Sequence, residues 1–246
     1  MKYIYILKIG ETFESTKNKF GDFNLWVRKF LGKSNKTIKT IHILNNQKLP
    51  NLQSAAGFII TGSHAMVSEE LQWSVELEKY IQKIASKNIP LLGICYGHQL
   101  IAKALGGRSA FNKKGVEIGR VKIKLSKSSL NDPLLKDLPK LFYAYETHYQ
   151  SAVKLPLTAI ILASNTKDNH QAVRFTKYIW GVQFHPEFDA NIMKEYIMNQ
   201  KEALTKNGFS VDTLLKNVKS CNMSHKILSN FLCIVQSKKV STNKMQ

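Results

Sequence analysis

The sequence predicts an α/β protein with a doubly wound, mixed but mostly parallel sheet flanked by helices, and a small antiparallel extension. Strand and helix patterns alternate through the first hundred residues, which is typical of parallel βαβ units. Residues 56–61 form a short, fully apolar run, as in a strand that is buried on both faces. From residue 108 to residue 180 successive strand patterns follow one another, which indicates the antiparallel part.

The first half of the chain contains four predicted strands and three predicted helices. Residues 2–9 alternate and are rich in Ile and Tyr, which favours a strand. Residues 18–31 place aromatic side chains at helical spacing and end at Gly32. A second helix is expected to begin near Ser68, with Glu69 and Glu70 in its first turn. The other predicted elements are strands at 37–44, 56–61 and 90–94, and a helix from about Leu100 that stops at Gly106 and Gly107.

The second half of the chain is predicted as strands followed by helices. The strands are expected at 108–111, 116–125, 141–146, 158–164, 170–175 and 178–184, and the helices at 189–204, 210–218 and 224–235. There is no internal repeat and no linker long enough to divide the chain. We therefore expect one domain at 1–204, a helical extension at 205–236, and a disordered tail at 237–246, which lacks an apolar pattern.

Composition favours a cytoplasmic protein that needs neither a membrane nor a metal. The chain has 246 residues and 43% hydrophobic content, enough for a full core. No run approaches the ~20 apolar residues of a membrane span, and the first residues are interpreted as a strand and not as a signal peptide. The three cysteines, Cys95, Cys221 and Cys233, are too few and too scattered for a disulfide framework or a zinc site. We expect no metal, no other cofactor and a reducing compartment.

The formal net charge of +19 suggests an anionic partner such as nucleic acid, a membrane surface or a phosphorylated substrate. The excess is nearly all Lys, however, whereas bidentate recognition of bases and phosphates usually depends on Arg. No aromatic residues alternate with the lysines as stacking platforms. We therefore expect an ordinary solvated surface and no specific nucleic-acid site.

One stretch has the pattern of a nucleophile on a sharp turn. Gly93-Ile94-Cys95-Tyr96-Gly97 lies between an apolar strand and a helical pattern, which is the context of a nucleophile elbow. The glycines allow a tight turn on either side of Cys95. The partial positive charge of the helix N-terminus favours a thiolate. The alternative is a buried structural cysteine.

A second stretch supplies a base and an acid. Gly181-Val182-Gln183-Phe184-His185-Pro186-Glu187 ends an apolar strand. In an extended backbone, residues i and i+2 face the same way, so His185 and Glu187 can act together. Glu187 would fix the imidazole tautomer, and the other nitrogen would take the proton of Cys95. The alternative is a chance pairing of a histidine at a strand end with a solvated glutamate.

Together these two stretches resemble the class I (triad) glutamine amidotransferases, whose fold is flavodoxin-like. The resemblance covers Met1 to about Tyr196. Within that family the chain is most similar to stand-alone proteins like the amidotransferase domain of GMP synthase. That likeness rests on Ile60-Thr61-Gly62-Ser63, Gly115-x-Glu117-Ile118-Gly119 and Thr147-His148-x-Gln150-Ser151.

The resemblance implies a mechanism and a set of site residues. Cys95 would attack the side-chain amide of glutamine, with His185 as base and then acid and with Glu187 orienting it. Ammonia would leave, and water would hydrolyse the γ-glutamyl thioester. The oxyanion would be held by the backbone N–H groups of Ser63 and Tyr96. The implied substrate contacts are Gly62, Gln99, His148, Tyr149 and Gln150.

Two departures from the family pattern keep other functions open. Many members have Gly-Gly-Pro where this chain has Gly62-Ser63-His64, and Ser63 adopts a left-handed conformation less readily than glycine. Gln150 stands where GMP synthases carry an acid that could pair with the substrate's ammonium. A γ-glutamyl hydrolase or peptidase with the same triad is therefore an alternative, and a non-catalytic binding protein is another. Without an ATP-pyrophosphatase signature, any synthetase that accepts ammonia would be a separate partner.

Overall fold

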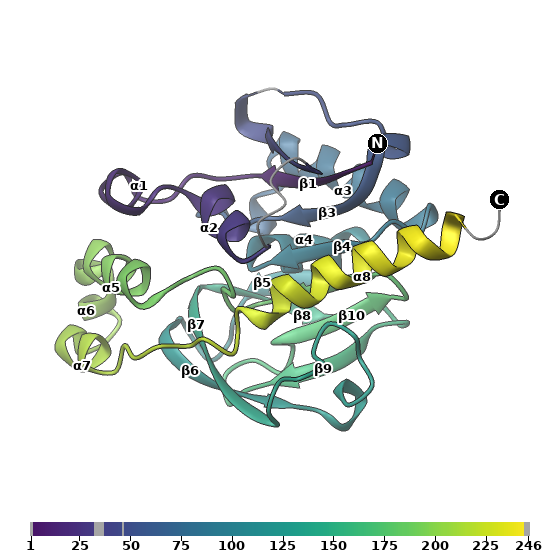
Figure 1. Ribbon diagram of the computed structural model, residues 1–246. Helices are drawn as coiled ribbons and strands as arrows, with labels where there is room; N and C mark the ends of the chain where they lie inside the picture. Colours follow the sequence, from purple (N-terminus) through teal and green to yellow (C-terminus); the bar gives the residue numbers. More distant parts are fainter. Residues whose placement is uncertain (1, 32–36, 46, 244–246) are drawn as a thin grey trace.

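The computed structural model describes residues 2–31, 37–45 and 47–243, and Figure 1 shows a central sheet covered by helices. Within these residues the main sheet has nine strands. Their order across the sheet is β2 (Ile38–His42), β1 (Tyr3–Lys8), β3 (Ala55–Ile60), β4 (Leu91–Ile94), β11 (Ile179–Val182), β10 (Ala172–Thr176), β9 (Ile160–Ser164), β6 (Glu117–Leu125) and β7 (Leu141–His148).

The sheet consists of a parallel half and an antiparallel half. The five strands from β2 to β11 run parallel, and the remaining four pair antiparallel. A separate two-stranded sheet pairs β5 (Arg108–Phe111) with β8 (Gln150–Lys154). The predicted fold class, with its antiparallel extension, is confirmed.

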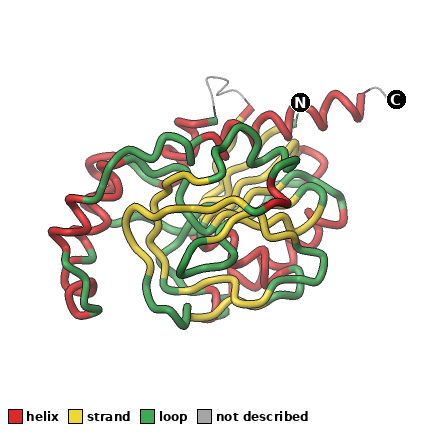
Figure 2. The backbone as a smooth tube through the Cα atoms, turned by 90° about the horizontal axis from the view of Figure 1, so that it is seen from below, coloured by secondary structure: helices red, strands yellow, loops and turns green. Residues whose placement is uncertain are grey.

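Alternation along the strands directs apolar side chains to two helical layers. Ile4 and Ile6 of β1 face α2 (Phe23–Phe30) and α8 (Lys226–Asn243). Tyr5 and Leu7 face α3 (Gln72–Ser86) and α4 (Tyr96–Ala104) on the other side. A third group of helices packs beside the sheet, as Figure 2 also shows from below. That group consists of α5 (Ala190–Asn199), α6 (Lys201–Lys206) and α7 (Val211–Lys216).

The C-terminal extension covers the core. Helix α8 crosses one face of the sheet (Figure 1), and Ile227, Leu228, Phe231, Ile234 and Val235 are buried there. This spacing forms a single apolar stripe. The helix continues through Asn243, so the predicted disordered tail at 237–246 is wrong for 237–243. Residues 244–246 lie outside the described residues.

Two predicted helices are each divided in two. The helix expected at 18–31 is α1 (Glu14–Phe20) followed by α2, because Gly21 has a φ of 78° and Asp22 caps α2 through the N–H of Phe23. The expected end at Gly32 lies outside the described residues. The helix expected at 189–204 is α5 followed by α6, with the division at Gln200.

The helix start predicted near Ser68 is also wrong. A short 3-10 turn covers Val67–Glu69, Glu70 is left-handed with a φ of 51°, and α3 begins at Gln72. Ser68 does not cap a helix because its N–H and hydroxyl bond to the side chain of Gln150. Strand β8, which begins at Gln150, was not predicted from the sequence.

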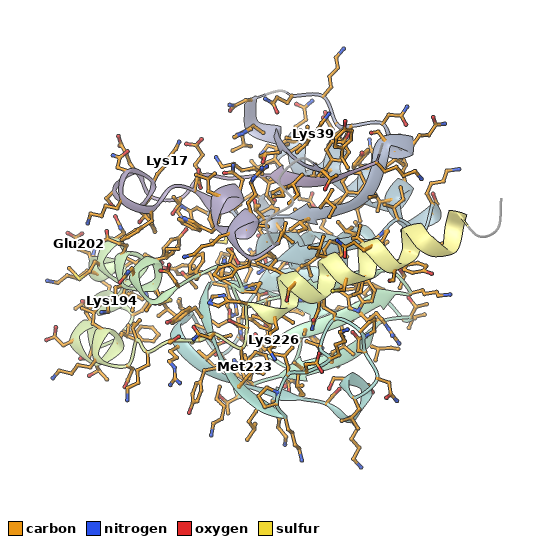
Figure 3. The ribbon with its side chains drawn as sticks, viewed as in Figure 1. Lys17, Lys39, Lys194, Glu202, Met223 and Lys226 are labelled. Atoms are coloured by element: carbon orange, nitrogen blue, oxygen red, sulfur yellow. The ribbon has the colours of Figure 1, made fainter. Side chains whose placement is uncertain are left out.

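The positive charge is spread over several elements. Figure 3 labels Lys17 on α1, Lys39 on β2 and Lys194 on α5, and these lysines belong to three separate parts of the fold. None of the helices described here is long and apolar enough to cross a membrane.

Candidate active site

Cys95 lies at the junction between β4 and α4. Its φ of 50° and ψ of −101° are rare for a residue with a side chain, and such a conformation costs on the order of 1–3 kcal/mol. The N–H of Cys95 donates to the carbonyl of Val182 at 2.9 Å, which attaches the turn to the neighbouring strand β11. The backbone therefore has the predicted strand–turn–helix geometry.

The glycines on either side of Cys95 are required by close packing. A Cβ on Gly93 would lie 2.5 Å from the carbonyl carbon and oxygen of Gly97. A Cβ on Gly97 would lie 2.6 Å from the carbonyl oxygen of Ile60. The absence of both side chains lets the start of α4 lie directly against β3 and β4.

The variant Gly97→Ala is expected to lose stability. The new methyl group would meet backbone atoms, which cannot move aside like a flexible side chain, so unfolding should become easier by about 1–3 kcal/mol. Urea denaturation followed by circular dichroism measures this difference. Gly115→Ala is the control, because nothing lies within 4 Å of its Cβ and its φ of 80° is the only obstacle. A smaller loss at Gly97 than at Gly115 would contradict the importance of packing at this turn.

A cavity of about 210 Å³ opens beside Cys95. Eight of the residues predicted for the site line it: Ser63, Cys95, Tyr96, Gln99, His148, Tyr149, Gln150 and His185. Gly62 lies behind them, since a Cβ there would be 3.0 Å from Cε1 of His185 and 3.8 Å from Cβ of Cys95. Glu187 does not line the cavity and is linked to it by its hydrogen bond with His185.

His185 is buried and has one ring nitrogen held and the other unbonded. Its Nδ1 donates to Oε1 of Glu187 at 2.8 Å, and its backbone N–H donates to the carbonyl of Tyr145 at 2.9 Å. Among the described residues Nε2 has no hydrogen-bond partner. Burial alone lowers the pKa of His185, but the negative charges of Glu187 and Cys95 outweigh it and raise the pKa to about 10. At neutral pH the imidazole is therefore a protonated group between the carboxylate of Glu187 and the sulfur of Cys95.

A chain of amides contacts the sulfur from the other side. Nε2 of Gln183 lies 3.6 Å from Sγ of Cys95, and Nε2 of Gln99 donates to Oε1 of Gln183 at 3.0 Å. The hydroxyl of Ser109 donates to Oε1 of Gln99 at 3.2 Å. Sequence reasoning missed Gln183, although its position two residues before His185, just after β11, was a usable signal.

Comparison with known proteins shows which family the chain belongs to. The family model described as "Glutamine amidotransferase class-I" matches residues 23–203, and this span includes the whole candidate site except Phe13. The chain belongs to that family.

The chain's relatives include a γ-glutamyl peptidase and a subunit of GMP synthase. The chain is 26% identical to γ-glutamyl peptidase 4 of Arabidopsis thaliana, over 94% of this chain and 95% of that protein. It is 31% identical to a glutamine-hydrolysing GMP synthase subunit of Pyrococcus abyssi, over 65% of this chain and 79% of that protein.

Solved structures from other organisms share this fold, and two of them illustrate the similarity. One is a glutamine amidotransferase from Thermotoga maritima, with a TM-score of 0.73, 23% identity, and coverage of 95% of this chain and 97% of the other. The other is a glutamine amidotransferase from Methylobacillus flagellatus, with a TM-score of 0.77, 19% identity, and coverage of 97% and 95%.

Gln150, where an acid was expected from the resemblance, bonds to Ser68. Its Oε1 accepts the N–H of Ser68 at 3.3 Å, and its Nε2 donates to the hydroxyl of the same residue. The side chain thus joins β8 to the 3-10 turn at Val67–Glu69. An acid at this position could accept hydrogen bonds from both the N–H and the hydroxyl of Ser68. Gln150 therefore bonds to the same two groups that an acid would.

The cavity beside Cys95 has an aromatic wall that the sequence did not predict. The centre of the His64 ring lies 4.4 Å from the centre of the Phe13 ring and 5.9 Å from that of Tyr196. The Phe23 ring meets His64 edge-on, with the two ring centres 6.4 Å apart. Burial, and secondarily the charge of His185, lowers the pKa of His64, so this wall is uncharged. Phe13 and Tyr196 are far apart in the sequence, and no local pattern links them.

Proposed function

We propose that this protein hydrolyses the side-chain amide of glutamine through a γ-glutamyl thioester on Cys95 and releases ammonia. The observation that carries the proposal is the pairing of His185 with Glu187 in the cavity beside the strained Cys95. Family membership supports the reaction class. The assignment of roles to individual residues is ours.

The first half of the reaction forms the thioester. The thiolate of Cys95 attacks the amide carbon, and the resulting oxyanion accepts hydrogen bonds from the backbone N–H groups of Tyr96 and Ser63. Tyr96 is the first residue of α4, so its N–H has no acceptor within the helix. As the C–N bond breaks, His185 gives its Nε2 proton to the nitrogen, and ammonia leaves.

The second half regenerates the enzyme. Nε2 of His185, now unprotonated, takes a proton from water, and the hydroxide attacks the thioester carbon. The C–S bond breaks, glutamate leaves, and Cys95 is again a thiolate beside a protonated His185. Glu187 keeps the proton on Nδ1 throughout, so that only Nε2 takes part in both transfers.

Ser63→Gly is expected to raise the basal turnover number kcat by about tenfold. If the Ser63 peptide must turn left-handed to point its N–H at the oxyanion, an L-residue there costs ~1–2 kcal/mol, and about 1.4 kcal/mol corresponds to a factor of ten in rate. Steady-state ammonia release from glutamine is the measurement. Ser63→Ala is the matched control because it loses the bond from the N–H of Ala65 to the Ser63 hydroxyl but keeps the Cβ. An equal gain in both variants would argue against a left-handed turn.

A second candidate function is hydrolysis of a γ-glutamyl peptide by the same residues. It is supported by the similarity to γ-glutamyl peptidase 4, which extends over 94% of the chain. The aromatic wall of the cavity supports it as well, because apolar surface beside the amide can bind a leaving group larger than ammonia.

One assay separates the two candidates. Purified protein is incubated with glutamine or with a γ-glutamyl dipeptide, and glutamate and the released amine are measured, with Cys95→Ala in parallel. The first proposal expects ammonia from glutamine at the higher kcat/KM. The second expects the dipeptide to be preferred. Activity that is equal in Cys95→Ala and in the unmodified protein would contradict both, and complete inactivity with all γ-glutamyl amides would favour a binding protein.

We also propose that ammonia from this reaction is consumed by a separate synthetase. The relative from Pyrococcus abyssi, which is one subunit of GMP synthase, supports a division of the reaction between two chains. The cytoplasm, expected from the scattered cysteines, stays a prediction.

A further inference from the structure

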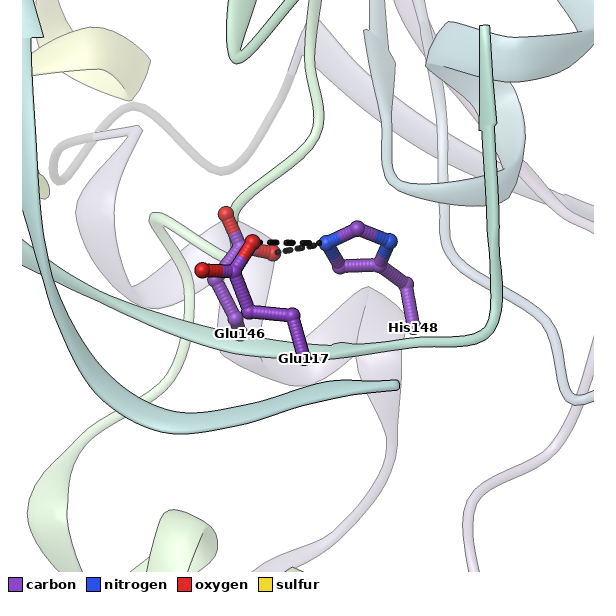
Figure 4. Close-up of side chains that lie close together, drawn as sticks. All are labelled: Glu117, Glu146 and His148. Atoms are coloured by element: carbon purple, nitrogen blue, oxygen red, sulfur yellow. Dashed lines mark hydrogen bonds and ion pairs between the residues drawn. The ribbon is translucent and has the colours of Figure 1, made fainter. Parts of the chain in front are cut away.

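Three buried ionisable side chains, Glu117, Glu146 and His148, lie close together, as Figure 4 shows. Glu117 of β6 pairs directly with His148 of β7, and Glu146 lies two residues earlier on the same face of β7. Nε2 of His148 lies 3.2 Å from Oε2 of Glu117 and 3.5 Å from Oε2 of Glu146. The side chains are between 0% and 6% exposed. The proposed hydrolysis assigns no step to either glutamate.

His148 and Glu117 are held in position from behind. Nδ1 of His148 donates to the carbonyl of Gln150 at 2.9 Å, and a carbonyl only accepts, so the proton must lie on Nδ1. Glu117 accepts from Asn165 at 2.8 Å and from Gln171 at 3.2 Å. A histidine that donates one ring N–H to a backbone carbonyl and turns the other nitrogen to a shared point is the usual arrangement around a metal ion.

Glu146 supplies a second, independent observation. Its side chain is fully buried and aimed at His148 (Figure 4), yet neither carboxylate oxygen has a hydrogen-bond partner among the described residues. Oε1 of Gln171, whose amide nitrogen bonds to Glu117, is buried without a partner in the same way. All three of these atoms are acceptors. Since an unpaired buried carboxylate is very costly, Glu146 requires either a positive group beside it or a proton of its own.

We propose that Glu117, Glu146 and His148 bind a divalent ion of the zinc type. When zinc binds its ligands tetrahedrally at about 2.0–2.1 Å, neighbouring ligand atoms lie about 3.4 Å apart. Nε2 of His148 lies 3.2 Å from Oε2 of Glu117 and 3.5 Å from Oε2 of Glu146, close to that separation. One imidazole and two carboxylates are donors that zinc accepts. Two negative charges and a 2+ ion also make the buried site neutral. His148 lines the cavity, so the ion would enter the site from the cavity.

The ion would join β6 to β7 at the end that supports the cavity. The carbonyl of Gln150 accepts from both His148 and Gln99, so a fixed His148 also fixes the amide chain that leads to Cys95. The expectation of no metal rested on the scattered cysteines and did not consider these three residues. Strand pairing brings Glu117 to the other two.

Zinc binding is tested in a Cys95→Ala background, which removes the thiol beside His185 as a competing site. Chelator-treated protein is titrated with Zn²⁺ by isothermal calorimetry, and bound zinc is counted by elemental analysis after dialysis. We expect one zinc per chain. Glu146→Gln in the same background should lower the affinity by at least about 100-fold, and Glu202→Gln, an exposed glutamate, should leave it unchanged.

The rival occupant is a proton. Burial, together with the charges of Glu117 and Cys95, raises the pKa of Glu146 well above its usual value, and a protonated Glu146 could donate to Gln171. Glutamine mimics that protonated state, so Glu146→Gln should then bind as much zinc as its parent. That result, or no bound zinc in the parent, overturns the proposal.

A second measurement does not depend on the Glu146 variant folding. X-ray absorption at the zinc edge of the loaded Cys95→Ala protein should show nitrogen and oxygen neighbours including one imidazole. A sulfur neighbour would place the ion on Cys221 or Cys233 and overturn the proposal. Neither experiment measures turnover. A failure of the zinc proposal is therefore distinguishable from a failure of the proposed hydrolysis.

Discussion

Replacement of Cys95 by alanine is expected to lower kcat/KM for the preferred γ-glutamyl amide by at least ~10⁴-fold. Without Sγ no thioester can form, and only the oxyanion donors and binding contacts remain to assist direct attack by water. Alanine keeps a Cβ and can occupy the same turn, so the fold should be retained. The measurement is steady-state release of glutamate, with circular dichroism to verify folding.

Cys233→Ala is the matched control for this prediction. Cys233 is exposed, whereas Cys95 is buried in the candidate site. We expect the control to retain its kcat/KM. A folded Cys95→Ala protein with activity comparable to the control would refute the nucleophile assignment.

Replacement of Glu187 by glutamine is expected to reduce kcat by about 10²–10⁴-fold. Glutamine has nearly the same shape, but it removes the charge that opposes the desolvation of His185. The pKa of His185, now about 10, should fall. His185 would then lose, at a lower pH, the proton that it donates to the leaving nitrogen. The tautomer of its neutral ring would also no longer be fixed.

The pH profile distinguishes this role from simple loss of structure. The pKa of His185 is raised above its ordinary value of 6.5, so the stability gained from its charge is fully present below about 6.5 and is lost as pH rises through about 10. The alkaline limb of kcat/KM should follow the same group and move to lower pH in Glu187→Gln. An alkaline limb that stays in place would show that Glu187 does not control His185.

The sequence predicted the parallel half of the fold, and most of the residues it singled out line one cavity, because those signals are local. Apolar runs and helical spacing mark β1, β3, β4 and α3 within short windows. The turn around Cys95 and the stretch from His185 to Glu187 each carry their residues within a few positions. Folding then brings both stretches to the same cavity.

The errors arose where distant residues decide a local conformation. Ser68 looks like a helix cap, but its N–H and hydroxyl bond to the side chain of Gln150, which is distant in the sequence. Gly21 adopts a positive φ within a pattern that is helical on both sides. Helix α8 continues past its last apolar residues through Asn243, so hydrophobic spacing could not locate its end.

The aromatic wall and the buried cluster depend on tertiary structure in the same way. Phe13 reaches Tyr196 only because α1 packs beside α5. Glu117 meets His148 only in the register of β6 on β7. Neither the spacing nor the composition of the chain contains this information.

The most direct test of the proposed chemistry is selective capture of a thiol by a glutamine-like electrophile. The protein is treated with a diazoketone or chloroketone analogue of glutamine, and the modification of each cysteine is followed by peptide mass spectrometry. Accessibility alone would favour the exposed Cys233 over the buried Cys95 and Cys221. We predict that Cys95 reacts first, and that Glu187→Gln slows its labelling but not that of Cys233. Labelling of Cys233 ahead of Cys95, or of all three at equal rates, would contradict a site built around Cys95.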